Sequence, residues 1–193
     1  IALKNSVEGA EDSIENGVSV IIEKGINRND VVLGISANGD APFIHSALEE
    51  AKKRGAITGL LMCNTPMKKD YIDYVISVIV GPEVITGSTR MKAGTATKFV
   101  LNMITTTAMI KLNKTYGNLM VDLTACNDKL WDRGARIVSK ITNLNYDDSL
   151  QLLKEADGEV KTAIVMDENN CSKSEAKDKL DSMNGSLSEV LDN

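Results

Sequence analysis

Short apolar runs alternate with longer amphipathic segments over the first half of the chain. The runs are rich in Val, Ile and Leu and are bounded by turn residues, which is typical of buried strands. They lie at residues 31–35, 56–63 and 74–80. Between the first two, residues 43–54 carry apolar side chains at helical spacing and end at Gly55, so they predict a helix. This order of elements favours a parallel sheet flanked by helices, which is an α/β fold.

Polar loops follow the first and third of these strands. Residues 36–39 come after the first strand, and residues 83–88 come after the third. Ligands of parallel α/β sheets gather beyond the carboxyl ends of the strands. Ser36, Asn38 and Gly39 are therefore candidate ligand contacts, and the Asn amide can bind sugar hydroxyls. Asn and Gly are also frequent in plain turns, so a purely structural role stays open.

Residues 1–25 have the pattern of a helix that brings acidic side chains together. The apolar positions at helical spacing are Leu3, Val7, Ala10 and Ile14. Glu8, Glu11 and Glu15 would lie close together on one face of this helix. A solvated acidic face is the simpler interpretation. The alternative is a positioned carboxylate that transfers a proton.

Residues 81–98, GPEVITGSTRMKAGTATK, join the third run to a long apolar segment. That segment is too long for a strand and is apolar on most sides, so we expect a buried helix over residues 89–112. Thr86, Ser88 and Thr89 carry small hydroxyl groups that suit the cap of such a helix.

The same junction has the features of an anion site. Gly87 lets the backbone approach a ligand closely, and Arg90 and Lys92 add positive charge. The free N–H groups of a helix start attract phosphate or carboxylate. A capped core helix whose cations face water is the alternative.

Beyond residue 112 the chain becomes more polar. Gly117-Asn118 predicts a break, and residues 119–141 predict another helix. Short helical pieces follow at 147–156, 160–166, 172–183 and 187–191. Ser172 and Glu175 have the spacing of a capping box. We therefore expect a domain over residues 1–142 and a small helical subdomain over residues 143–193.

Composition narrows the functional classes. The 193 residues are 42% hydrophobic and 25% charged, with a net charge of −5 and no local basic face for nucleic acid. No apolar run reaches the ~18–20 residues of a membrane span. The cysteines are odd in number and far apart, which indicates a reducing, cytoplasmic setting. They are Cys63, Cys126 and Cys171. The single histidine, His45, is expected to be a structural or surface residue, although an imidazole can also act in catalysis.

The string that begins at Gly81 resembles the signature of the N-acetylmuramic acid 6-phosphate etherases, which belong to the sugar isomerase (SIS) domain superfamily. Further similar strings lie at 7–12 (Val-Glu-Gly-Ala-Glu-Asp), 116–123 and 127–130. The resemblance runs from about residue 3 to the end of the chain. It implies an SIS-type parallel sheet followed by a compact three-helix subdomain, and a homodimer.

This resemblance implies a carbon–oxygen lyase that cleaves the D-lactyl ether of N-acetylmuramic acid 6-phosphate. The products would be N-acetylglucosamine 6-phosphate and D-lactate. A base removes the C2 proton of the open-chain aldehyde, an acid assists the loss of lactate from C3, and water then adds. The chemistry requires no metal or redox cofactor. The setting would be amino-sugar recycling from the cell wall.

The resemblance also singles out individual residues. It implies that Glu11 is one of the acid/base pair, with the role of C2 base favoured and Glu8 as the alternative assignment. The implied substrate-binding residues are Glu83, Ser88, Thr89, Arg90, Ser36, Asn38 and Gly39. Glu83 could equally be a loop carboxylate that caps the N–H groups of Thr86 or Gly87. Asp40 departs from the family pattern, and its charge would oppose a nearby phosphate.

Two rivals remain open. One is an SIS-type sugar-phosphate isomerase, which uses the same enol chemistry without loss of an ether. The other is a non-catalytic regulator that senses sugar phosphates. The resemblance further implies that roughly the first hundred residues of the family's domain precede residue 1, with a phosphate loop and a second catalytic glutamate. The 193 residues alone are then expected to be inactive.

Overall fold

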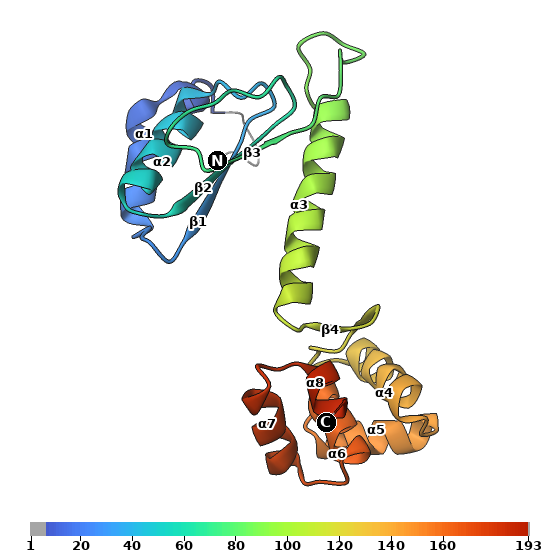
Figure 1. Cartoon of the computed structure of the whole chain (residues 1–193). Coiled ribbons are helices and arrows are strands. Elements are labelled where there is room, and N and C mark those ends of the chain that lie inside the picture. Colours follow the sequence, from blue (N-terminus) through green and yellow to red (C-terminus); the bar gives the residue numbers. More distant parts are fainter. Residues whose placement is uncertain (1–6, 193) are drawn as a thin grey trace. The chain divides into compact units, whose positions relative to one another are not determined.

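A parallel sheet of three strands organises the first part of the chain (Figure 1). The structure is a computed structural model, and it describes residues 7–192. β1 (Val31–Ile35), β2 (Ile57–Met62) and β3 (Tyr74–Ser77) lie in the order β1-β2-β3. The α/β class and all three strands are confirmed. β3 is shorter than the predicted run, although the Val78 amide still donates to the Met62 carbonyl at 2.9 Å.

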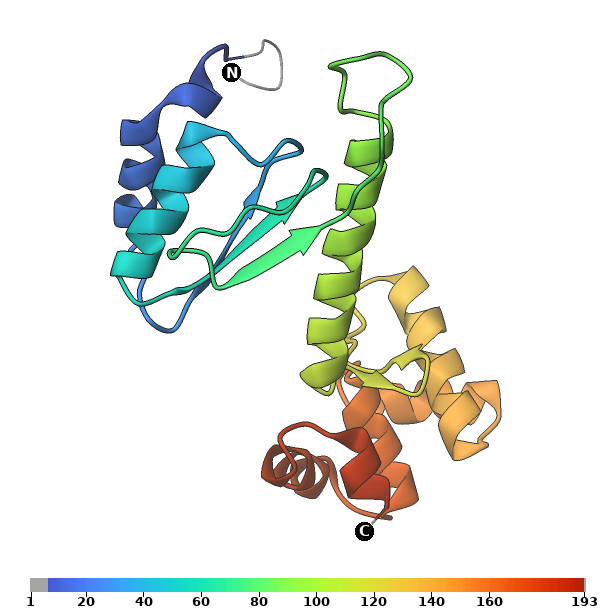
Figure 2. The ribbon, with the colours of Figure 1, turned by 45° about the horizontal axis from the view of Figure 1, so that its top comes forward.

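Two helices, α1 (Ile14–Glu23) and α2 (Pro42–Lys53), lie side by side on one face of this sheet (Figure 2). α1 runs through Gly17 without a break. A Cβ atom at Gly17 would lie 2.4 Å from the Phe43 carbonyl oxygen, so the two helices approach closely there. The buried side chains beneath them are aliphatic, and they include Ile21, Leu48, Leu60 and Met62.

The predicted helix over residues 1–25 is only partly correct. A 3₁₀ turn, η1 (Ala10–Asp12), precedes α1, and Gly9 before it has φ 72°. Ser13 caps α1 by accepting the Asn16 amide at 3.2 Å. Glu11 therefore lies on η1 and not on the helix. Residues 1–6, which include the predicted apolar position Leu3, lie outside the described part of the chain.

The long apolar segment forms α3 (Lys92–Lys111), three residues later than the predicted start. The expectation that this helix is buried is wrong, because Ala93 is its only buried residue in the described chain. Phe99 is 68% exposed and Met109 is 52% exposed. A helix that is apolar on most sides and yet exposed offers a surface for another protein layer. None of the described helices is long and apolar enough to cross a membrane.

After α3 the described part of the chain, up to residue 192, forms a small hairpin and five helices. The hairpin strands are β4 (Thr115–Tyr116) and β5 (Leu119–Met120), joined by Gly117 and Asn118. The helices are α4 (Asp128–Thr142), α5 (Tyr146–Glu155), α6 (Val160–Glu168), α7 (Lys173–Ser182) and α8 (Leu187–Leu191). The predicted helix over 119–141 is thus wrong before Asp128, where the Asn127 side chain caps α4. The four later helices and the capping box of Ser172 and Glu175 are confirmed.

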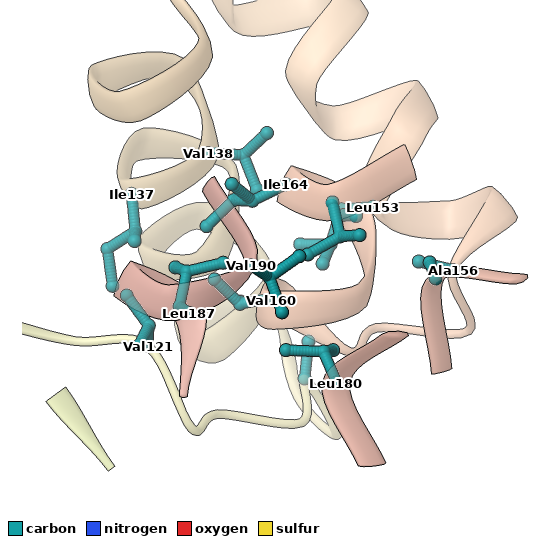
Figure 3. Close-up of a cluster of buried hydrophobic side chains, with 14 residues drawn as sticks. Val121, Ile137, Val138, Leu153, Ala156, Val160, Ile164, Leu180, Leu187 and Val190 are labelled. Atoms are coloured by element: carbon teal, nitrogen blue, oxygen red, sulfur yellow. The ribbon is translucent and has the colours of Figure 1, made fainter. Parts of the chain in front are cut away.

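These helices enclose a core of their own (Figure 3). Val138 of α4, Leu153 of α5 and Ile164 of α6 are all fully buried. The chain divides into two compact units between Asn102 and Met103, which is within α3. This division differs from the expected one after residue 142, because the apolar face of α4 packs on α5 and α6. Four helices, where three were expected, follow that residue.

The hydrogen bonds of Asp73 couple the stability of the first unit to acid pH. Its carboxylate accepts hydrogen bonds from Lys52 and, at 2.9 Å, from the Thr58 amide, which lower its pKa from 3.8 to about 2. The stabilisation is therefore complete above about pH 4 and is lost as the pH falls through about 2. We expect Asp73→Asn to lower Tm at pH 7, with a difference from the wild type that vanishes near pH 2. Circular-dichroism melts against pH measure this. Asp70→Asn is the exposed control, and equal losses in both variants would contradict the assignment.

Candidate active site

A pocket of about 490 Å³ lies at the carboxyl end of β1 in the first unit. Glu11 and Asp12 of η1 line it, together with Ser36 and Asn38 from the loop after β1. Thr89, from the segment before α3, is also part of the lining. Side chains from three separate stretches of the sequence therefore meet at the edge of the sheet where α/β proteins bind ligands.

The loop after β1 is held by hydrogen bonds of its own side chains. The Gly39 amide donates to Ser36 Oγ at 3.1 Å, and Asn38 Nδ2 donates to Asp40 Oδ2 at 2.9 Å. Gly39 is buried with φ +94°, and a Cβ atom there would lie 2.4 Å from Met62 Cε. A side chain at this position would therefore strain the backbone and displace Met62.

Asn64 joins this loop to the other strand ends, and the sequence reasoning missed it. Its Nδ2 donates to Asn38 Oδ1 at 2.9 Å, and its carbonyl accepts Ser77 Oγ at 2.6 Å. Asn64 thus links the loop after β1 to the end of β3. The signal in the sequence is a polar residue that ends a strand and precedes Thr65-Pro66.

The charge of the pocket is negative. Glu11, Asp12 and Asp40 line it, whereas no Lys or Arg does so among the described residues. Carboxylate oxygens accept hydrogen bonds from hydroxyl and amide groups but repel an anion. This pocket therefore suits the polar, uncharged part of a ligand better than a phosphate group.

The start of α3 differs from its prediction. Glu83 caps the helix, because its two carboxylate oxygens accept the Lys92 and Ala93 amides, each at 3.0 Å. Both bonds lower the pKa of Glu83, and the bond from the Ala93 amide has the larger effect. The predicted caps lie earlier in the chain, at Thr86, Ser88 and Thr89. The protein's own carboxylate thus occupies the N–H groups that were expected to attract an anion.

Four of the expected site residues do not line the pocket, and Gly39 is the one that belongs to the loop after β1. Ser88 closes a turn through its amide, which donates to the Ile85 carbonyl at 3.1 Å. Arg90 is exposed two residues before α3 begins, and Glu83 is engaged with the helix start. The structure therefore brings Glu11, Ser36 and Asn38 together with Thr89 but leaves these four outside the pocket lining.

A second cavity of about 490 Å³ lies in the other unit, lined by the segment after β5, the start of α6 and the last turns of α7. Lys161 is nearly buried in it, and its ammonium contacts Asp122 at 3.0 Å and the Gly185 carbonyl at 2.8 Å. None of the expected catalytic residues lines this cavity, so the candidate site is the pocket at β1. No group of three His, Cys, Asp or Glu residues within 7–192 is placed to hold a metal ion.

Comparison with known proteins gives closely similar relatives. A protein of Geobacillus thermodenitrificans (strain NG80-2) is 44% identical over 192 residues, which are 99% of this chain and 65% of that protein. Proteins of Clostridioides difficile (strain 630) and Rhodopirellula baltica (strain DSM 10527 / NCIMB 13988 / SH1) are 46% and 44% identical, and each is covered to 63%. All three are named N-acetylmuramic acid 6-phosphate etherase. The chain thus spans somewhat less than two thirds of their length. No protein-family model matches it.

The cap at the start of α3 can be tested through its amides. We expect Glu83→Ala to accelerate hydrogen exchange at Lys92 and Ala93, because both amides lose their acceptor. Glu83→Gln keeps one acceptor oxygen and should have an intermediate effect. Amide exchange followed by NMR measures this, with the amides of α5 as the internal control. Unchanged exchange at both positions would show that another group caps the helix.

Proposed function

Because this chain belongs to the family of N-acetylmuramic acid 6-phosphate etherases, we propose that the protein cleaves the D-lactyl ether of N-acetylmuramic acid 6-phosphate. D-lactate and N-acetylglucosamine 6-phosphate are the products. The observation that carries the proposal is the pocket at the end of β1, where Glu11 faces the same space as Ser36, Asn38 and Thr89. This combination supports acid/base chemistry beside groups that bind hydroxyls.

Glu11 is the proposed base. The carbonyl of the open-chain sugar acidifies the proton on C2, and the Glu11 carboxylate removes it. Lactate then leaves C3 with the help of an acid, and water adds to the unsaturated aldehyde. No hydrogen bond or ion pair within residues 7–192 occupies the Glu11 carboxylate, so its oxygens are open to a substrate. A positioned acid or base contributes about 10²–10⁴-fold.

The proposed binding residues form two groups, one for the uncharged part of the sugar and one for its phosphate. Ser36, Asn38 and Thr89 bind the hydroxyl and acetamido groups of the sugar, with Gly39 shaping the loop. Arg90 and Ser88 lie outside the carboxylate-lined pocket, and we assign the phosphorylated end to them because Arg pairs with phosphate. Glu83 acts indirectly by capping α3 beside this segment.

Glu11→Gln tests the catalytic assignment. We expect the variant to lose D-lactate release by about 10²–10⁴-fold, because the amide cannot take up the C2 proton. N-acetylglucosamine 6-phosphate, a product, should still bind. An enzymatic D-lactate assay and calorimetry measure the two effects in the enzyme expressed from its complete gene.

Glu8→Gln is the matched control, since Glu8 is exposed close to Glu11 and does not line the pocket. Full activity of Glu11→Gln would refute the role of Glu11, and loss of activity in Glu8→Gln alone would transfer the role to Glu8. A wild-type enzyme that isomerises the sugar without releasing lactate would favour the isomerase alternative. Binding without turnover would favour the sensor.

We also propose that a second copy of the chain covers an apolar groove of the first unit. Val80, Val84, Met91 and Phe99 line this groove together with aliphatic parts of neighbouring residues. Val84 is 82% exposed and Phe99 is 68% exposed. Large exposed apolar surfaces on a single protein usually mark an interface. Interfaces of homodimers are more apolar than other protein surfaces, which suits this groove.

Phe99→Glu tests the dimer. We expect the molar mass measured by light scattering to shift toward that of a monomer, since a charge would be buried at the contact. Phe99 is exposed, so the circular-dichroism spectrum should not change. Lys98→Glu is the control, because Lys98 is exposed next to the groove without lining it. A monomeric wild type, or a Phe99→Glu dimer, would contradict the proposal.

A further inference from the structure

The only histidine of the chain contacts the loop of residues 36–40, which follows β1. His45 lies on α2, and its Nε2 is 2.7 Å from the Gly39 carbonyl oxygen. Its Nδ1 is 3.0 Å from the Tyr71 hydroxyl, and the two rings meet edge to face at 83°. His45 does not line the pocket that contains Glu11, so it reaches the loop without facing the proposed substrate.

The two partners determine which ring nitrogen carries the proton. A carbonyl oxygen can only accept, so Nε2 must donate to Gly39. In the neutral imidazole Nδ1 is then an acceptor, and the Tyr71 hydroxyl donates to it. Burial, followed by the nearby Glu49 carboxylate, raises the pKa of Tyr71, so this hydroxyl keeps its proton at neutral pH. Tyr71 thus selects the tautomer that His45 needs.

The Gly39 peptide connects His45 to residues that line the pocket. Its carbonyl is held by His45, while its amide donates to Ser36 Oγ at 3.1 Å. The flanking residues, Asn38 and Asp40, are joined to each other at 2.9 Å. Since Ser36 and Asn38 line the pocket, a shift of the Gly39 peptide would move both side chains that are proposed to bind the sugar.

We propose that His45 is a positioning residue, which fixes the loop of residues 36–40 through the Gly39 carbonyl, with its tautomer set by Tyr71. The proposal rests on the proposed function of that loop. His45 transfers no proton to the substrate. Its effect is on substrate binding, and it arises from the geometry of Ser36 and Asn38.

Steady-state kinetics of D-lactate release test the proposal in the enzyme expressed from its complete gene. We expect His45→Leu to raise KM roughly 3- to 10-fold with little change in kcat, because one neutral hydrogen bond that orders the loop is lost. His45→Gln should restore most of the affinity, since its amide nitrogen can take the place of Nε2. Tyr71→Phe should have an intermediate effect, because it leaves the tautomer unselected.

NMR of the single imidazole gives an independent readout. With ¹⁵N-histidine labelling, one pair of ring signals reports the tautomer, and we expect the Nε2–H form in the wild type and a mixture in Tyr71→Phe. An Nδ1–H wild type would overturn the proposal. So would an unchanged KM in His45→Leu, or a Gln variant as impaired as the Leu variant.

The proposed function and the positioning role of His45 can be refuted separately. A wild-type enzyme that releases no D-lactate would refute the proposed function, and the inference about the loop would fall with it. An active wild type in which His45→Leu changes kcat but not KM would refute only the positioning role.

Discussion

Side-chain hydrogen bonds to loop backbone are the constraint on which the candidate site depends. The carboxyl edge of a parallel sheet leaves backbone groups without ladder partners, and such groups are costly when buried. Here the partners are side chains from other segments: His45 for the Gly39 carbonyl, Ser77 for the Asn64 carbonyl and Glu83 for the Lys92 amide at the start of α3. Each of them reaches across the chain. The positions of the loops therefore follow from these few contacts.

Strands and helices whose sequence signals lie within a short stretch of the chain were predictable. The strands, α2 and the four helices after residue 142 each carry their own periodicity or cap, as Ser172 and Glu175 illustrate. The hairpin at 115–120 was not predictable in this way. Leu119 and Leu123 have helical spacing, but the two-residue turn at Gly117-Asn118 pairs Leu119 with Tyr116 instead. Tertiary pairing overrode a local pattern that fits either structure.

In the candidate site, too, residues in local motifs could be predicted, whereas contacts between distant residues could not. Motifs nominate Glu11, Ser36, Asn38 and Thr89, and the sheet topology explains why stretches so far apart meet. The supporting residues carry no motif. Glu83 caps a helix that begins nine residues later, and Asn64 binds a side chain 26 positions away. A single sequence can mark Asn64 as a polar residue after a strand, but it does not indicate which distant residue will be the partner. The cap was therefore assigned to the nearer hydroxyl residues.

The polar groups of the first unit thus fall into two kinds. Asp73 and Glu83 accept several hydrogen bonds from the protein, which lower their pKa and make them weak bases that hold the fold together. Glu11 lies on a short 3₁₀ turn, and no partner within the described residues occupies its oxygens. A carboxylate that takes a proton from carbon needs free oxygens, whereas the loop that carries Asn38 is fixed by the bonds of this residue to Asp40 and Asn64. Under the proposed function, Glu11 has free oxygens to act as the base, and Asn38 keeps a second N–H that can donate to a sugar hydroxyl.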